Sequence, residues 1–291
     1  TKGEITENVI KTHFPHNLVQ YNQGPSKIWI PKQISKIGAN AFYPQDTYTV
    51  DGQTYPVSNY LNTVKFDNRD SNLEIDDYAF YRTSLKDISY GSYISKIGNY
   101  AFSSIFDIDG NGSITLPKNL SDLGEYAFFN SGFTELNVED GSTFTELPLY
   151  VFGTNSKLKS MNIANTQVKD IANYAFSGNR MLKDVSFSPT LEKIGDDAFS
   201  DHLKIDTITF PETLEEIGQQ AFRAVGDFNL FKEVGNTLMS EGYPDYSIGY
   251  LDVSGSALKT LTFNKNLTTI GNYAFGNNPN LKNIVLPRSL T

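Results

Sequence analysis

The hexapeptide IGNYAF occurs twice, at Ile97–Phe102 and at Ile270–Phe275. Two identical strings in a chain of 291 residues indicate either a site used twice or a unit that many parts of the chain share. Related strings throughout the chain favour the shared unit. The further copies are IGANAF (37–42), IDDYAF (75–80), LGEYAF (123–128), LPLYVF (147–152), IANYAF (171–176), IGDDAF (194–199) and IGQQAF (217–222).

The spacing of these copies predicts a solenoid. Successive terminal Phe residues lie 38, 22, 26, 24, 24, 23, 23 and 53 positions apart. A period near 23–24 falls within the leucine-rich repeat range of roughly 20–29 residues. The two long intervals predict inserts near 43–60 and 223–256, although the second interval leaves open a degenerate repeat. The nine Phe are expected to stack as a ladder inside the coils, because one coil cannot bury its own apolar face.

A second element precedes most hexapeptides and predicts a short strand. In LKDVSF (182–187) and LKTLTF (258–263) the last three residues alternate apolar, polar and apolar, as in a strand with one buried face. Turns such as FPETLEEIG (210–218) join the two elements. Pro148 occupies the glycine position of the hexapeptide in one copy, so this position does not require a positive φ. Gly, Asp and Pro at this position favour the start of a short helical turn.

The complete unit, L-x-x-[ILV]-x-[FL]-P-x-x-L-x-x-I-G-x-x-A-F, resembles the BspA-like subclass of leucine-rich repeats, the type found in treponemal and other bacterial surface proteins. The resemblance covers about residues 28–291, and LPRSL at 286–290 matches the turn of the family. It implies an α/β repeat solenoid, a right-handed superhelix with a parallel β-sheet on its concave face and short helical turns on its convex side. We expect residues 1–27 to form an N-terminal capping segment. Residues 28–291 would form about ten repeats, the last one truncated.

Composition argues against several classes of function. The chain carries 33 acidic and 24 basic side chains, a net charge of −9, which disfavours binding to nucleic acid phosphates. It has no cysteine, which rules out disulfides and thiol chemistry. No apolar run approaches the ~20 residues that cross a bilayer, so we expect no membrane insertion of this segment. Without a recognisable catalytic motif or acid–base pair, we expect neither an enzyme nor a cofactor. The abrupt start TKGE and the end VLPRSLT suggest a fragment of a longer protein.

The outward positions of the predicted strands are the first candidates for ligand binding. They form a long, shallow polar surface, which suits a protein or glycan better than a small metabolite. Alternatively, these residues only solvate a β face. Trp29 is the only Trp, and it is either an interface hot spot or is covered by the N-terminal segment. The candidates are Trp29, Lys65, Asp87, Ser89, Glu135, Asn137, Asn162, Asp184, Thr207, Thr209, Thr260 and Thr262.

Tyrosines form two further candidate surfaces. The insert at 223–256 contains Tyr243, Tyr246 and Tyr250, and loops on rigid repeats often carry function. Tyr also occupies the fourth position of the hexapeptide in five consecutive copies. This row is either a glycan-stacking stripe or a set of rings half-buried between coils. Its members are Tyr78, Tyr100, Tyr126, Tyr150 and Tyr174.

The stretch DIDGNGSITLPK (107–118) partly matches a calcium loop. Asp107, Asp109 and Asn111 correspond to the first three side-chain ligands of an EF-hand, but Lys118 stands where the bidentate Glu belongs. The stretch is therefore a weak calcium site or a polar turn between coils.

The resemblance also implies a function. It points to a secreted or cell-surface bacterial protein that binds proteins or glycoproteins of a host or of other cells. The alternative is a passive spacer in a larger surface protein that presents another domain, including an enzymatic one.

Overall fold

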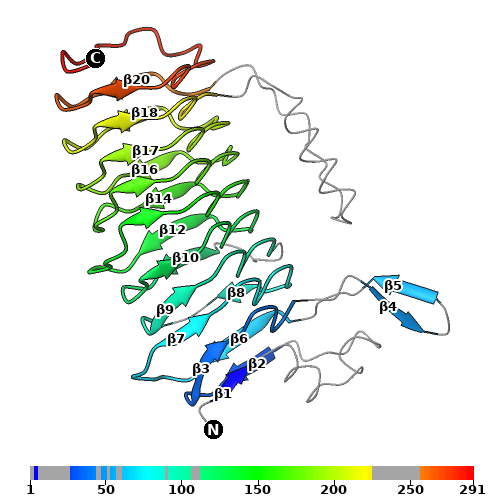
Figure 1. Ribbon diagram of the computed structural model, residues 1–291. Coiled ribbons are helices and arrows are strands. Elements are labelled where there is room, and N and C mark those ends of the chain that lie inside the picture. The colour runs from blue at the N-terminus through cyan, green and yellow to red at the C-terminus, as the bar shows by residue number, and fades with distance from the viewer. Residues whose placement is uncertain are drawn as a thin grey trace.

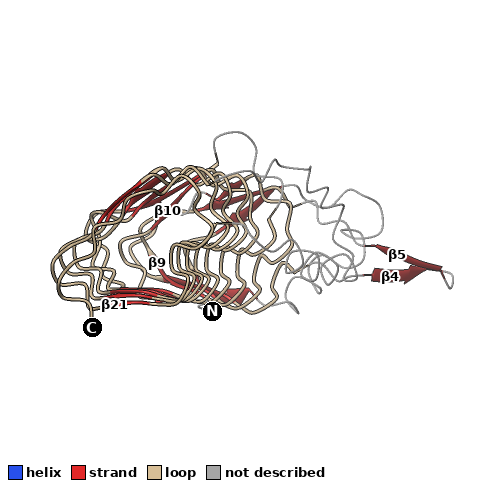
Figure 2. Ribbon diagram, turned by 90° about the horizontal axis from the view of Figure 1, so that it is seen from above, coloured by secondary structure: helices blue, strands red, loops and turns tan. Residues whose placement is uncertain are grey.

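Each coil of the chain contributes two short strands, which lie on two opposite walls of a flattened solenoid (Figures 1 and 2). The structure is a computed structural model. It describes residues 3–5, 27–43, 47–50, 53–56, 61–88, 91–105, 112–224 and 256–291.

The first wall contains the strands that the alternating residues predict. Its strands are parallel and form three sheets, in the orders β2-β6-β8, β10-β12-β14-β16 and β18-β20. The predicted parallel sheet is therefore confirmed, and we call its outward side the first face. Its strands are β2 (Lys27–Ile30), β6 (Thr63–Phe66), β8 (Asp87–Ile88), β10 (Ser113–Leu116), β12 (Glu135–Val138), β14 (Ser160–Asn162), β16 (Asp184–Ser186), β18 (Thr207–Thr209) and β20 (Thr260–Thr262).

The second wall lies where the sequence predicts only turns. Its strands are also parallel and form two sheets, β1-β3-β7-β9-β11 and β13-β15-β17-β19-β21. We call its outward side the second face. Its strands are β1 (Gly3–Ile5), β3 (Ile34–Ile37), β7 (Leu73–Ile75), β9 (Ile94–Ile97), β11 (Asp122–Leu123), β13 (Glu146–Leu147), β15 (Asp170–Ile171), β17 (Lys193–Ile194), β19 (Glu216–Ile217) and β21 (Thr269–Ile270).

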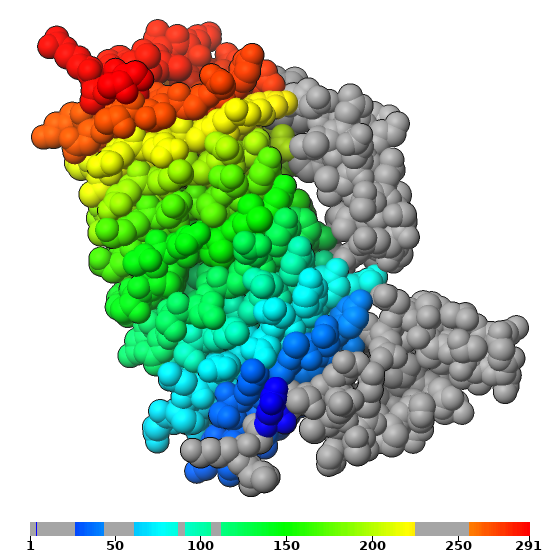
Figure 3. All heavy atoms as spheres, in the orientation of Figure 1, coloured from blue at the N-terminus to red at the C-terminus, as the bar shows by residue number. Residues whose placement is uncertain are grey.

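The predicted phenylalanine ladder forms the core. All nine Phe stack in sequence order, with ring centroids 4.9–5.6 Å apart and ring planes within 3–16° of parallel. Burial of each ring contributes about 1.5–3 kcal/mol. The space-filling view shows the coils as successive coloured bands in direct contact (Figure 3).

Both long intervals of the sequence lie between adjacent coils. Phe42 stacks on Phe80, and Phe222 stacks on Phe275. The strands on either side of the second interval also pair directly, β18 with β20 and β19 with β21. The coils on either side of the second interval are therefore direct neighbours in the stack. The first interval contains an antiparallel hairpin of β4 (Thr47–Val50) and β5 (Gln53–Pro56).

The expected helical turns are not confirmed, because the described residues contain no helix. The fourth residue of the hexapeptide has a positive φ in every copy, for example +56° at Asn40 and +55° at Tyr100. A right-handed helix does not permit this backbone conformation. Glycine occupies the second position of the hexapeptide for a reason other than the start of a helix. A Cβ on Gly98 would lie 2.5 Å from the amide nitrogen of Asp77, and one on Gly124 would lie 2.4 Å from that of Asn99. Glycine there allows one coil to approach the backbone of the preceding coil closely.

A buried polar position lies three residues after the ladder Phe in several coils. Asn155 and Asn278 use their amide Nδ2 to donate hydrogen bonds to the carbonyls of the Phe in their own and the preceding coil. Asn179 donates to the carbonyl of Phe152 in the preceding coil. These bonds satisfy carbonyls that the Phe turns would otherwise bury without a partner.

Candidate functional site

The first face carries most of the predicted binding residues as exposed side chains. Asn137 is half-buried. Asp87 lies in β8, but its side chain and Ser89 lie outside the described part of the chain. The exposed members are Trp29, Lys65, Glu135, Asn162, Asp184, Thr207, Thr209, Thr260 and Thr262.

Strand register places these residues in rows across the face. Trp29 lies opposite Lys65, Glu135 and Asp184 both lie opposite Ser160, and Thr209 lies opposite Thr262. Adjacent strands are about 4.8 Å apart, so side chains in one row reach a common ligand. Among these predicted residues, the charge changes from a base in the second coil to acids in the middle and hydroxyls near the C-terminal end.

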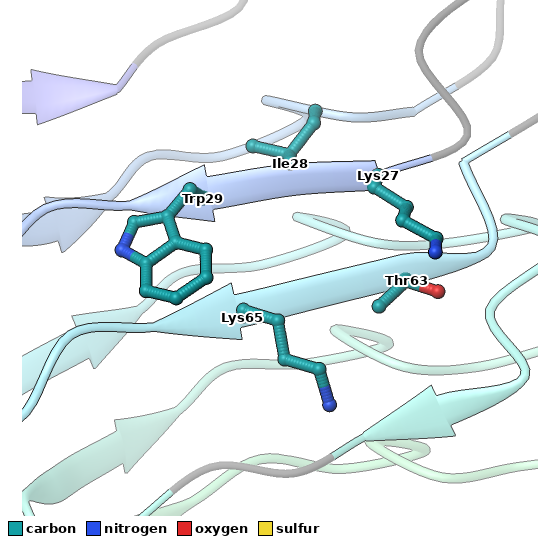
Figure 4. Close-up of a pocket in the computed structure, with 5 residues that line it drawn as sticks. All are labelled: Lys27, Ile28, Trp29, Thr63 and Lys65. Carbon is teal, nitrogen blue, oxygen red and sulfur yellow. The ribbon is translucent and has the colours of Figure 1, made fainter.

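The only Trp lines a shallow depression at the N-terminal end of this face. The depression has a volume of about 590 Å³ and is lined by Lys27, Ile28, Trp29, Thr63 and Lys65, which we call the Trp29 patch. Figure 4 shows the indole ring lying across the gap between β2 and β6, with the two lysines on the same side of the strands. The Trp29 side chain is 65% exposed. The N-terminal segment that the alternative places over it lies mostly outside the described residues.

One side chain of the second coil holds Trp29, and a second fixes the turn that follows it. Its indole Nε1 donates a hydrogen bond to Asp67 Oδ1, and Asp67 Oδ2 accepts a second bond from the backbone nitrogen of Lys32, at 3.2 Å. The guanidinium of Arg69 donates to the carbonyls of Pro31 (3.0 Å) and of the start of β3. The turn that follows Trp29 is therefore fixed at several points, and the indole is preorganised.

Sequence reasoning missed Asp67 and Arg69. They lie 38 residues beyond their partners Trp29 and Pro31, across the first long interval. Asp67 directly follows β6, as Glu139 directly follows β12, where it accepts an equivalent hydrogen bond from the backbone nitrogen of Lys118. Only the pairing of β2 with β6 brings them beside the first coil.

The second face pairs several of its charges internally. Lys36 and Lys96 both contact Asp76, at 2.8 and 3.4 Å. Two further cross-strand pairs join Lys169 to Glu192 (2.8 Å) and Lys193 to Glu216 (3.1 Å). Exposed pairs of this kind contribute about 0–1 kcal/mol each, but they reduce the charge that a ligand would meet.

The tyrosine row is a second ladder between the coils, as the structural alternative predicts. Adjacent rings from Tyr78 to Tyr174 stack with centroids 4.6–4.9 Å apart, and the rings are mostly half-buried. Burial raises the pKa of Tyr100 to about 12. The facing sides of adjacent rings cover each other, so the middle of the row presents mainly edges and hydroxyls. Such a row offers few aromatic faces to a glycan.

Two predicted sites fall outside the described residues. Tyr243, Tyr246 and Tyr250 belong to the second insert, and Asp107, Asp109 and Asn111 belong to the calcium-like stretch. Across the described ranges, no cluster of three carboxylate or histidine side chains is arranged to hold a metal ion. The same ranges contain no helix that could span a membrane.

Comparison with solved structures finds one leucine-rich repeat protein that shares this architecture and others with lower TM-scores. A leucine-rich repeat protein from Bacteroides ovatus has a similar fold, with a TM-score of 0.55 and 22% identity over 90% of this chain and 66% of that one. One from Eubacterium ventriosum gives a TM-score of 0.49 and 18% identity over 70% and 60% of the two chains. This chain thus spans about two thirds of the length of both relatives. A leucine rich cell surface protein from Faecalibacterium prausnitzii gives a TM-score of 0.37 and 15% identity over 96% and 82%. No curated protein sequence matches the chain.

The repeat itself identifies the family. A sequence model of the BspA type Leucine rich repeat region matches residues 12–152, 106–229 and 246–291, which together cover most of the chain. The nine hexapeptide copies lie within the matched ranges. The chain belongs to the BspA-type leucine-rich repeat family.

Proposed function

We propose that this chain is the binding module of a cell-surface or secreted bacterial protein. It mediates adhesion by binding proteins or glycoproteins, of a host or of other cells, through the first face. The proposal assigns it no catalytic role.

The observation that carries this proposal is the Trp29 patch. An exposed Trp leaves a large apolar surface in water, and aromatic residues of this kind are enriched at binding hot spots. Asp67 and Arg69 fix the position of Trp29 and the turn beside it, which reduces the entropy that a partner must remove on binding. The rows of Glu135, Asp184 and the threonines extend the same face along the stack.

The alternative is a passive spacer that presents another domain of a longer protein. The two continuous aromatic ladders support it, because they stiffen the stack over many coils. A spacer, however, has no need of a preorganised Trp on its surface.

Charge reversal on the first face separates the two functions. The double variant Glu135→Lys/Asp184→Lys and the single variant Trp29→Ala are compared with wild type for binding to immobilised extracellular glycoproteins and matrix proteins. The control is Glu146→Lys, an exposed reversal on the second face. A binding module loses binding in the first two proteins and keeps it in the control. Equal binding by all four proteins, or none by wild type, would favour the spacer.

Two further elements are proposed as parts of this function. The insert with Tyr243, Tyr246 and Tyr250 is a second binding element, and its removal should weaken the same partners. The stretch with Asp107, Asp109 and Asn111 holds a weak calcium ion. Titration with calcium should raise the melting temperature, and an unchanged temperature would remove this assignment.

A further inference from the structure

We propose that the Trp29 patch binds an acidic sugar residue, a pyranose ring that carries a carboxylate. This inference rests on the proposed function and names the chemistry that one part of the first face would recognise.

The first requirement for a sugar is an aromatic platform, and the indole supplies one. Its only polar atom, Nε1, is already bonded to Asp67, so a ligand meets the apolar ring. The face of an aromatic ring is the negative part of its quadrupole. The C–H groups on one side of a pyranose are weakly positive and lie in a plane, so they stack on such a face.

The second requirement is a cation at the right distance, and two lysines meet it. Lys65 lies opposite Trp29 on β6, and Lys27 lies two residues before it on β2. Neighbouring strands are about 4.8 Å apart, and side chains on one face of a strand repeat every ~6.6 Å. These spacings match the width of one pyranose with its carboxylate. Thr63, opposite Lys27, adds a hydroxyl for the sugar hydroxyls.

The charge around the patch selects the size of the anion. At its border, Asp67 accepts hydrogen bonds from two N–H groups, and Asp87 of the next strand lies opposite Thr63. The chain as a whole carries a net charge of −9, which repels long polyanions such as nucleic acids. A depression of about 590 Å³ on a flat sheet accommodates one or two sugar rings and offers no deep hole for a peptide anchor. An acidic monosaccharide within a glycan fits these limits better than an acidic peptide.

The single Trp makes the test specific to this site. Because Trp29 is the only Trp, its fluorescence, excited where tyrosine does not absorb, reports on the patch alone. The whole chain is titrated with glucuronic acid and, in parallel, with glucose, which differs only by lacking the carboxylate. We expect a saturable change in emission with glucuronic acid and about tenfold weaker binding of glucose, since hydrogen bonds to charged groups contribute more than neutral ones.

Variants identify the residues that bind. Lys27→Gln/Lys65→Gln should weaken glucuronic acid binding about tenfold and leave glucose binding unchanged. Lys183→Gln, an exposed lysine of a distant coil, is the matched control and should bind as wild type. For Trp29→Ala, which removes the fluorescence, saturation-transfer NMR on the sugar ring protons should lose its signal. All these side chains are exposed, and melting curves confirm that each variant is folded.

Several outcomes would overturn the inference. They are no saturable change with glucuronic acid, equal binding of glucose and glucuronic acid, or tighter lysine-dependent binding of an Asp/Glu peptide. Glycoprotein binding that depends on Glu135 and Asp184 but not on Lys27 and Lys65 also overturns it, while the proposed function stands. Sugar binding as expected without any glycoprotein binding leaves this inference standing and overturns the proposed function.

Discussion

His202 occupies the buried position that asparagine fills in neighbouring coils. Its Nε2 donates a hydrogen bond of 3.0 Å to the carbonyl of Phe222 in the next coil, which also accepts from Asn278. Its Nδ1 is buried and has no partner among the described residues. Burial lowers the pKa of His202 to about 4, so the imidazole is neutral in the folded chain at neutral pH.

This histidine predicts a loss of stability in acid. Above pH 6.5 both states hold it neutral, but between pH 6.5 and 4 only the unfolded state takes up the proton. The contribution of His202 to the free energy of unfolding should therefore fall by about 3 kcal/mol across this window. The free energy of unfolding of wild type minus that of His202→Asn, measured by urea unfolding at a series of pH values, should show this decrease. Burial raises the pKa of the adjacent Asp201 to about 6, which increases the free energy of unfolding as the pH falls. Both proteins contain Asp201, so this effect cancels when they are compared. Parallel pH profiles for the two proteins would contradict the prediction.

Gly98 makes a second prediction at the scale of one residue. Gly98→Ala places a methyl group against the backbone of Asp76 and Asp77, which cannot move without separating two coils. The free energy of unfolding should fall by about 1–3 kcal/mol. Ala172 occupies the same hexapeptide position in another coil, and the reverse change Ala172→Gly should cost less than about 1 kcal/mol. Equal losses in chemical unfolding would show that close approach is not the reason for the glycine.

At the scale of elements, the ladders hold the coils together. The Phe ladder runs through the core, and the Tyr ladder runs beside it on the turns. Each ring contacts the rings of the coils before and after it, so one residue contributes to two interfaces. Hydrogen bonds reinforce the same interfaces, for example from the nitrogen of Phe152 to the carbonyl of Ala175 at 2.9 Å.

Truncation of a ring in the middle of the ladder should therefore be costly. Phe176 is almost fully buried between Phe152 and Phe199, and Phe176→Ala should lower the free energy of unfolding by about 3–5 kcal/mol. Phe275 is only half-buried, so Phe275→Ala should cost clearly less. Thermal unfolding measures both, and an unchanged melting temperature for Phe176→Ala would exclude the stacking account.

The period and the buried residues of these elements could be read from the sequence, because Ile, Ala and Phe repeat where they pack. The second wall could not, because its strands are mostly two or three residues long and show no full alternation. The positive φ at the fourth hexapeptide position could not be predicted from the sequence either. Asn40 and Asp197 are residues that tolerate it, but Tyr fills this position in most coils. In the Trp29 patch, Trp29 and Lys65 followed from strand alternation, whereas Asp67 required the spatial register of two coils.

At the scale of the whole molecule, the stack continues past its long inserts without a gap. Strand pairing and ring stacking connect the coils before and after residues 225–255 directly. The contacts that join these two coils are therefore made by residues outside 225–255, and we expect the stack to form without the insert.

Replacement of residues 225–255 by one Asn tests this independence. It restores the six-residue spacing from Phe222 to Leu258 that Phe152 and Leu158 show, and it places Asn at the buried polar position. We expect circular dichroism to be unchanged and the melting temperature to stay within a few degrees, as for tolerated loop changes. Aggregation, or loss of a cooperative transition, would show that the insert supports the stack.

The hydrogen bonds that join adjacent coils give the molecule a directional response to tension. The termini lie at opposite ends of the stack, so a pull between them loads these bonds along their own direction, one coil at a time (Figure 1). Each coil of 22–26 residues would release about 80 Å of contour length, and the coil with the second insert, 53 residues, about 180 Å. Single-molecule stretching should show this series of steps, and one all-or-none extension would contradict it. An adhesive module with such a series would lengthen in stages under flow while its other coils stay folded.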